Sequence, residues 1–518
     1  MGSKYLMKIR DIAEVFDGPH ATPKKIDVGP YFLSISSLVN GQLDLSKSAH
    51  LSKEQFKKWT KRVTPQVGDV LFSYETRLGE AALMPAGVTA CLGRRMGLLR
   101  PDQSKVLPEY LLYAYLSPVF QQEIKKRTIH GATVERISLR ELPDFDIHIP
   151  EIKKQRKVIN TLNAINNKIS LNKKNNHTLE QMAQALFKSW FVDFDPVFDN
   201  LLASVDFNLD NLETSLPDEL KQKAQRRLVA LNNLENAVEC KASLSALAHE
   251  LQAFSPTQAA VSAAETPVQP NFSANPKVLV QHANTHSHFP NEFERNEQLG
   301  WIPKGWEVSA LSKLINIKHG FAYKGEFFSE EKTKDVLLTP GNVKVGGGFK
   351  GDKYKYYKGP IIEEYRFNKN DMYVNMTDLS KASDTLGYPA VVPEMDGITF
   401  HHNQRLGKVL YTDHRSAKAG FIYQILCSNN SRNNILASAT GTTVKHTSPT
   451  KILSLMICHS GGSIESLYEK NAKILSEKLA GNNSNNIDLT KLRDTLLPKL
   501  ISGELQIPDS ANVSDNNI

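Results

Sequence analysis

The chain has 518 residues, which is long enough for more than one domain. Its hydrophobic content of 40% is sufficient for packed cores, yet no stretch approaches the ~18 uncharged apolar residues of a membrane span. The formal net charge of +8 is compatible with an acidic partner such as nucleic acid but does not identify one.

The cysteines and the first residues bear on the cellular compartment. Cys91, Cys240, Cys427 and Cys458 form no CxxC or zinc spacing, so disulfides and structural zinc are not expected. The chain begins without an apolar signal core. We therefore expect a cytoplasmic protein.

The first 150 residues have the pattern of a compact mixed α/β domain. Short strand-like runs at Tyr31–Leu38 and Asp69–Tyr74 are bounded by Gly and Pro. A broad apolar face recurring every 3.6 residues predicts a helix over Pro108–Lys126. A last strand is expected at Asp144–Ile149.

Residues 151–195 carry the clearest element, a long heptad helix. Its apolar seam, with two central asparagines, is Val158, Leu162, Ile165, Ile169, Asn172, Asn176, Leu179, Ala183, Leu186 and Trp190. A seam of this period needs a partner helix, and buried Asn residues in it fix the register at a cost in stability. Seven basic residues and no acid lie between Lys153 and Lys174, either as a solvated face or near phosphates.

The remainder of the chain alternates between helical, polar and mixed stretches. Residues 196–299 predict a helical insert followed by a disordered linker rich in Pro, Ala, Ser, Thr and Asn. A second mixed domain is expected over 300–460, and helices over 461–505, with a disordered tail at 506–518. The Gly- and Asn-rich run Gly481–Asn486 predicts a break in those last helices.

The two halves are related by a repeat at a spacing of 310 residues. The matched pairs include Arg95 and Arg405, Gly97 and Gly407, Tyr113 and Tyr423, Asn172 and Asn482, and Asn176 and Asn486. Two diverged copies of a domain and a helix indicate two similar tasks on two different targets, although duplication can also simply enlarge a fold.

Motifs of catalysis are largely missing from the sequence. It contains no GxxxxGK[ST] phosphate loop, no HExxH zinc motif and no Asn-Pro-Pro-aromatic motif for a flipped base. One loose PD…ExK pattern, Asp144 with Glu151 and Lys153, is compatible with a magnesium-dependent nuclease. The second copy has Leu453, Ser454 and Gly461 where the first has Pro143, Asp144 and Glu151, which weakens that alternative.

Three segments resemble the specificity subunit of type I restriction-modification systems. They are LEQMAQALFKSWFVDF at Leu179–Phe194, LGWIPKGW at Leu299–Trp306 and LRDTLLPKLISGEL at Leu492–Leu505. The resemblance covers nearly the whole chain. It implies a fold of the α+β / α/β class, with two mixed α/β target recognition domains, 1–150 and 300–460, separated by two long antiparallel coiled-coil helices within 151–195 and 461–505.

The resemblance also implies a function. The chain would read a bipartite sequence in double-stranded DNA and would scaffold two methyltransferase (M) subunits and restriction (R) subunits. It would have no catalytic residue, no metal, no cofactor of its own and no membrane contact. The alternatives are the nuclease and a coiled-coil protein adaptor that does not bind DNA.

Candidate DNA contacts lie in the loops around the matched arginines. Base readout needs Arg, Lys, Asn or Gln at base edges, whereas phosphate contacts need only charge. The candidates are Tyr74, Arg77, Arg94, Arg95, Asn375, Lys381, His402, Gln404 and Arg405. Arg95 and Arg405 could instead match because both hold the domain's own fold.

Overall fold

The computed structural model describes residues 5–20, 22–39, 41–130, 134–212, 216–253, 282–378, 380, 384–412, 418–442 and 444–508. The chain forms two compact units, Met1–Asn176 with Ala480–Ile518, and His177–Leu479. None of the described helices combines the length and the apolarity needed to cross a membrane.

A four-stranded antiparallel sheet forms the centre of the first unit. Its order is β2 (Ala13–Asp17), β10 (Met96–Pro101), β7 (Val70–Ser73) and β8 (Ala81–Leu83). Two helices follow it in the chain, α3 (Pro108–Leu116) and α4 (Pro118–Lys126), each with proline in its first turn, where the missing N–H is not needed. The ring of Tyr115 contacts Phe72 of β7 and Phe120 of α4, at centroid distances of 5.8 and 4.9 Å, so the helices bury one face of the sheet.

A second, smaller sheet extends the first unit. Its order is β6 (Ala49–His50), β3 (Ile26–Phe32) and β9 (Ala90–Cys91), and β3 pairs parallel with β9. Around it lie η2 (Ile35–Ser37), the hairpin β4 (Leu38–Val39) with β5 (Gln42–Leu43), η3 (Leu45–Lys47) and α2 (Lys53–Trp59). Near the chain's start, β1 (Leu6–Lys8) pairs with β11 (Asp146–His148), and α1 (Ile9–Ile12) follows β1.

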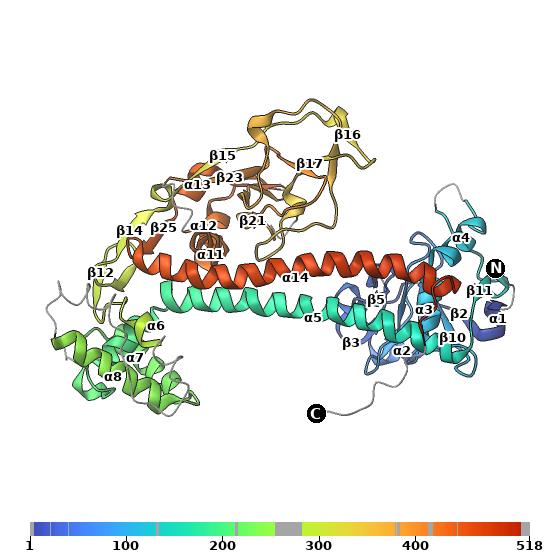
Figure 1. Cartoon of the computed structure of the whole chain (residues 1–518), viewed down its shortest axis with the longest axis horizontal. Helices are drawn as coiled ribbons and strands as arrows, with labels where there is room; N and C mark the ends of the chain where they lie inside the picture. Colours follow the sequence, from blue (N-terminus) through green and yellow to red (C-terminus); the bar gives the residue numbers. More distant parts are fainter. Residues whose placement is uncertain are drawn as a thin grey trace. The chain divides into compact units, whose positions relative to one another are not determined.

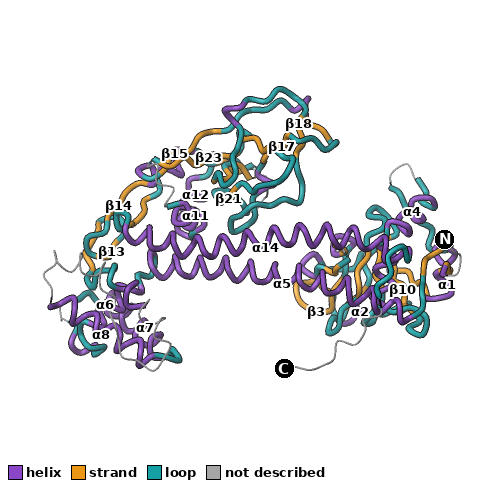
Figure 2. The backbone as a smooth tube through the Cα atoms, viewed as in Figure 1, coloured by secondary structure: helices purple, strands orange, loops and turns teal. Residues whose placement is uncertain are grey.

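The second unit repeats this architecture. Its central sheet has the order β15 (Ile315–His319), β23 (Leu406–Tyr411), β19 (Met372–Asn375) and β21 (Pro389–Val391), followed by α11 (Ala419–Cys427) and α12 (Asn429–Ser438). The smaller sheet has the order β16 (Phe328–Ser329), β18 (Lys355–Tyr357), β17 (Asp335–Leu338) and β22 (Thr399–His402), again with one parallel pair, β17 with β22. Loops make up much of the chain around β17 and β18 (Figure 2). The fold class expected from the sequence, two mixed α/β domains with long coiled-coil helices, is confirmed.

The remaining strands and short helices complete the second unit. A hairpin of β12 (Phe293–Asn296) with β13 (Gly300–Pro303) precedes β14 (Glu307–Ala310), which pairs with β25 (Met456–His459) as β1 pairs with β11. β20 (Thr377–Asp378) pairs with β24 (Lys445–His446), and α13 (Pro449–Leu453) follows. β12 lies inside the stretch expected to be insert and linker. The pattern there was too short and polar to indicate a strand.

Two long helices of 40 residues each, α5 (Ile152–Phe191) and α14 (Ser463–Ser502), run antiparallel side by side (Figure 1). All ten residues of the predicted seam of α5 are buried or half-buried, as a heptad helix with a partner requires. The expected break at Gly481–Asn486 is wrong, because α14 continues through it. Three asparagines of that run, Asn482, Asn483 and Asn486, form hydrogen bonds with α5. Asn482 donates to Asn176 at 2.8 Å, and Asn486 accepts from Asn172 at 3.0 Å.

The helical insert packs within the second unit. It contains α6 (Asp195–Ala203), α7 (Asp218–Asn232) and α8 (Ala237–Ala253), which lie together in Figure 1. An aromatic cluster joins the end of α5 to its surroundings. Trp190 meets Phe289 at 5.3 Å, and Phe191 meets Phe421 at 4.7 Å between ring centroids. Most of the predicted disordered linker and tail, 254–281 and 509–518, lies outside the described residues.

Candidate nucleic-acid interface

A polar groove of about 460 Å³ opens on the first unit. We call it the serine groove, and its polar lining residues are Thr22, Lys25, Ser34, Ser36, Ser46, Lys47, Ser48 and Arg94. Hydroxyl groups can donate and accept hydrogen bonds, and the three cations carry the opposite charge to phosphate. The lining is therefore suited to a polyanion that also presents hydrogen-bonding edges.

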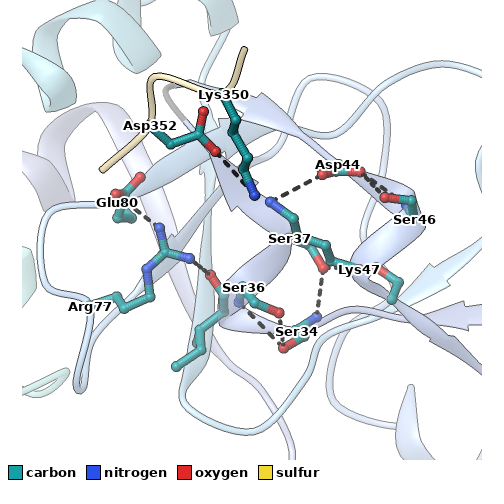
Figure 3. A network of polar contacts seen from close by, with 12 residues as sticks. Ser34, Ser36, Ser37, Asp44, Ser46, Lys47, Arg77, Glu80, Lys350 and Asp352 are labelled. Atoms are coloured by element: carbon teal, nitrogen blue, oxygen red, sulfur yellow. Dashed lines mark hydrogen bonds and ion pairs between the residues drawn. The ribbon is translucent and has the colours of Figure 1, made fainter. Parts of the chain in front are cut away.

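Local hydrogen bonds fix the hydroxyls of the serine groove (Figure 3). Ser34 caps η2 by accepting from the backbone N–H of Ser36 at 3.3 Å, and the two hydroxyls lie 2.9 Å apart. Asp44 caps η3 in the same way, accepting from the backbone N–H and the hydroxyl of Ser46 at 3.1 and 2.6 Å. Such caps hold polar side chains of short turns in place.

Asp44 also restrains a cation of the groove. Its carboxylate lies 3.2 Å from Lys47 Nζ (Figure 3). The hydrogen bond from Ser46, followed by that from Lys47, lowers the pKa of Asp44, so the carboxylate is ionised at neutral pH. Since both groups are near the surface, the ion pair is weak and leaves Lys47 able to meet a phosphate.

Arg77 links η2 to Glu80, the residue directly before β8 (Figure 3). One guanidinium nitrogen donates to the carbonyl of Ile35 at 3.0 Å, and another pairs with Glu80 at 3.1 Å. Arg77 was among the predicted DNA contacts. The structure gives it a role in holding η2, the turn that carries Ser36.

The two adjacent arginines of the first copy, Arg94 and Arg95, differ from one another in their surroundings. Arg94 is exposed and lines the serine groove. Arg95 pairs with Glu75 at 3.2 Å, donates to Thr76 Oγ1 at 3.1 Å and has a positive φ of 70°. Tyr74 is buried, with 9% of its surface exposed, and burial together with Asp17 raises the pKa of its hydroxyl. Arg95 and Tyr74 therefore hold the fold around the turn that presents Arg94.

A second groove, of about 360 Å³, was not foreseen from the sequence. Its lining includes His20, Lys58, Trp59, Lys61 and Arg62. Lys58 lies over the ring of Trp59 at 5.6 Å. Basic residues interleaved with an aromatic ring are typical of nucleic-acid surfaces. The run Lys57-Lys58-Trp59-Thr60-Lys61-Arg62 was the available signal.

In the second unit the turn between β22 and β23 presents two of the predicted residues. Gln404 and Arg405 are exposed. The backbone N–H of Gln404 donates to the carbonyl of Phe321 at 2.9 Å, and that of Arg405 donates to Asn403 Oδ1 at 3.1 Å. The backbone is therefore held while both long side chains face solvent.

The other predicted residues of the second unit lie inside it. Asn375 is fully buried and donates to Thr385 Oγ1 at 2.8 Å. His402 is 1% exposed, and its Nε2 faces the carbonyl of Leu406 at 2.9 Å. Burial lowers the pKa of His402 to about 4. Lys381 lies outside the described residues. The strands that carry Asn375 and His402 are buried on both faces, β19 at every position and β22 at all but its first, so alternation along the strand could not have separated buried from exposed positions.

The residues of the nuclease alternative are engaged in ion pairs and hydrogen bonds of the fold. Asp144 pairs with Arg10 at 2.5 Å, and Glu151 accepts from the hydroxyl of Tyr5 at 3.5 Å. In the described part of the chain, neither carboxylate belongs to a group of three possible metal ligands. Such a group does occur in the second unit, where one ligand atom each from Asp199, His282 and His286 lie within 4.8 Å of one another.

Comparison with known proteins places these features in a family context. The family model for the type I restriction modification DNA specificity domain matches residues 4–181. The HindI type I specificity subunit of Haemophilus influenzae is 25% identical over 429 residues, which cover 79% of this chain and 80% of that protein. The MjaIX type I specificity subunit of Methanocaldococcus jannaschii is 28% identical over 205 residues, 36% of this chain and 44% of its own length.

Solved structures give a further likeness. The type I restriction-modification S subunit from M. genitalium aligns over 99% of this chain and 98% of its own, with a TM-score of 0.43 and 14% identity. The HsdS subunit from Thermoanaerobacter tengcongensis aligns over 96% and 97%, with a TM-score of 0.30 and 11% identity.

Proposed function

The chain belongs to the family of type I restriction-modification specificity subunits, and we propose that it is the non-catalytic subunit that selects a two-part DNA sequence for its complex. The observation that carries the proposal is a shared position in two copies of one fold. In each copy the turn before the central strand, β10 or β23, presents an exposed, long polar side chain at matched positions, Arg94 and Gln404. One scaffold with two different loop chemistries suits two different half-sites.

Contacts to the DNA divide by side-chain chemistry. Lysines such as Lys25 and Lys58 are suited to phosphates, because a point charge needs no fixed direction. Arg94 and the serine hydroxyls are suited to base edges, since a guanidinium forms two parallel hydrogen bonds with guanine and hydroxyls pair with several bases. In the second copy, Gln404 and Arg405 are suited to adenine and guanine respectively.

The helices α5 and α14 would then serve as scaffold. Their paired length offers a surface for two methyltransferase subunits, with restriction subunits joining the larger assembly. Cofactors would belong to those partners, and the chain would work in the cytoplasm, where it meets DNA.

The experiment is a map of methylated sites in cells that express the chain with its methyltransferase partner. We expect methylation at a single two-part sequence. Replacing residues 5–150 with those of a relative should change one half of that sequence and leave the other half unchanged. Methylation without a defined sequence, or no effect of the exchange, would favour a protein adaptor. Cleavage of DNA by the purified chain with magnesium would favour the nuclease.

A further inference from the structure

The helical insert contains a buried group of polar side chains that DNA recognition does not use. Asp199 lies on α6, and His282 and His286 lie on a short helix after the linker, one turn apart and so on one face. Asp199 is fully buried and His286 is 5% exposed. Asn200 clamps the short helix to α6 by donating to the carbonyls of His286 and Phe289, both at 2.9 Å.

The hydrogen bonds of His286 leave a place for a cation. Its Nδ1 lies 2.9 Å from the carbonyl oxygen of His282, which can only accept, so Nδ1 carries a proton. Its Nε2 then faces Asp199 Oδ2 at 3.0 Å. A lone pair on Nε2 would repel the carboxylate at this distance. A proton on Nε2, or a metal ion bound to both atoms, removes this repulsion.

The surroundings have the features of a metal centre. A backbone carbonyl that orients one imidazole nitrogen and leaves the other free is the usual support of a metal-bound histidine. His282 Nδ1 is buried and has no hydrogen-bond partner, and its ring stacks on that of His286 with 4.0 Å between centroids. Two imidazoles and one carboxylate form a donor set that zinc prefers.

The charges in the group are compatible with one divalent ion. Burial opposes ionisation of Asp199, but hydrogen bonds from Arg227 and His286 hold its pKa below the usual value. Arg227 contacts both carboxylate oxygens of Asp199 at 2.7 and 2.8 Å. It also lies 3.5 Å from Asp195, whose carboxylate offsets part of the positive charge of Arg227.

We propose that Asp199, His282 and His286 bind one zinc ion or a similar borderline divalent metal, with solvent as the remaining ligand. Bonds of ~2.0–2.1 Å at tetrahedral angles place ligand atoms about 3.3 Å apart. The Asp199–His286 distance of 3.0 Å is close to that value, and the ligand atoms of all three residues lie within 4.8 Å of one another. The ion would join the end of the linker to α6.

The test is metal binding by the untagged full chain. Chelator-treated protein is dialysed against zinc and its content measured, and cobalt is bound in a parallel sample, where visible absorption bands report four- or five-coordinate nitrogen and oxygen ligands. We expect one equivalent of zinc per chain and a higher melting temperature with zinc. The variant His282→Ala should bind at least about tenfold more weakly.

The control is His249→Ala, which removes an exposed histidine of the same insert that lies 3.8 Å from Asp206. It should bind like the parent chain. Asp199→Asn should also bind zinc more weakly. If that variant fails to fold, His282→Ala still decides the matter, because His282 Nδ1 forms no hydrogen bond in the fold. A parent chain that takes up no zinc in excess, or a His282→Ala variant that binds as the parent does, overturns the proposal and assigns the position between Nε2 and Oδ2 to a proton.

Discussion

Asn172 of α5 donates its side-chain amide to Asn486 of α14 at 3.0 Å, and the repeat makes this contact the counterpart of a second one. Asn486 is the copy of Asn176, and Asn482, which bonds Asn176 at 2.8 Å, is the copy of Asn172. Exchanging the two helices therefore converts each of these contacts into the other. Reciprocal pairing of this kind is the mark of twofold symmetry in an interface.

The buried asparagines should set the register of the helix pair. Asn172→Leu leaves Asn486 without its partner, and we expect a loss of about 1–3 kcal/mol in the free energy of unfolding. The double variant Asn172→Leu with Asn486→Leu should recover stability, because an apolar seam packs well. Chemical denaturation measures both. Asn167→Leu, at an exposed position of α5, is the control and should change the value by no more than ~0.5 kcal/mol.

Substitution of Arg94 should affect DNA binding, whereas substitution of Arg95 should affect the stability of the fold. Arg94→Ala removes an exposed side chain of the serine groove, so the melting temperature should stay unchanged while DNA affinity of the assembled complex falls about 10- to 100-fold. Arg95→Ala loses the contacts to Glu75 and Thr76 and should lower the melting temperature. Thermal melts and binding titrations at one fixed salt concentration check both. A stable Arg94→Ala complex with parental affinity would contradict the role given to Arg94.

The helix pair should act as a ruler between the half-sites. Four residues added near Asn172 of α5, with four added near Asn482 of α14, lengthen each helix by about 6 Å. The unspecified spacer of the DNA target should grow by one or two base pairs, at ~3.4 Å each. The half-sites themselves should not change. A map of methylated sites with an unaltered spacer and full activity would show that the helices do not set the distance.

His402 should make the second unit sensitive to acid. Burial lowers its pKa to about 4, below the ordinary 6.5, and the nearby Lys408 and Lys318 act in the same direction. The folded state binds this proton less readily than the unfolded state, so stability is full above pH 6.5 and falls as the pH drops toward 4. The loss is about 2 kcal/mol by pH 5. Denaturation at pH 7 and pH 5 should show a smaller loss for His402→Phe than for the parent chain.

The sequence predicted the parts of the fold that depend on periodicity. The seam of α5, including the burial of Asn172 and Asn176, follows from a pattern that repeats every 3.5 residues. The break predicted at Gly481–Asn486 was wrong because the prediction relied on helix propensity, which is low for Gly and Asn. In the folded chain, contacts with α5 outweigh this low propensity. A local scale contains no information about a partner helix.

The candidate interface was predictable only in part. The sequence located the turn that carries Arg94 but could not distinguish it from Arg95, because which of two adjacent arginines faces solvent depends on the positive φ at Arg95. The serine groove combines residues from η2, η3 and the turn before β10, which are distant in sequence. The spacing of His282 and His286, one helical turn, is visible in the sequence. Asp199 is distant from them in sequence and comes close only when the insert folds.

The reciprocity of the asparagine contacts has a consequence for the exchange of domains. Two copies of α5 placed antiparallel would set Asn172 of one against Asn176 of the other, the same contact that α14 now completes. The pairing surface is thus self-complementary and does not depend on the loops that each domain displays. An exchange of either domain for that of a relative, at a junction within the helices, would therefore leave the asparagine contacts in place.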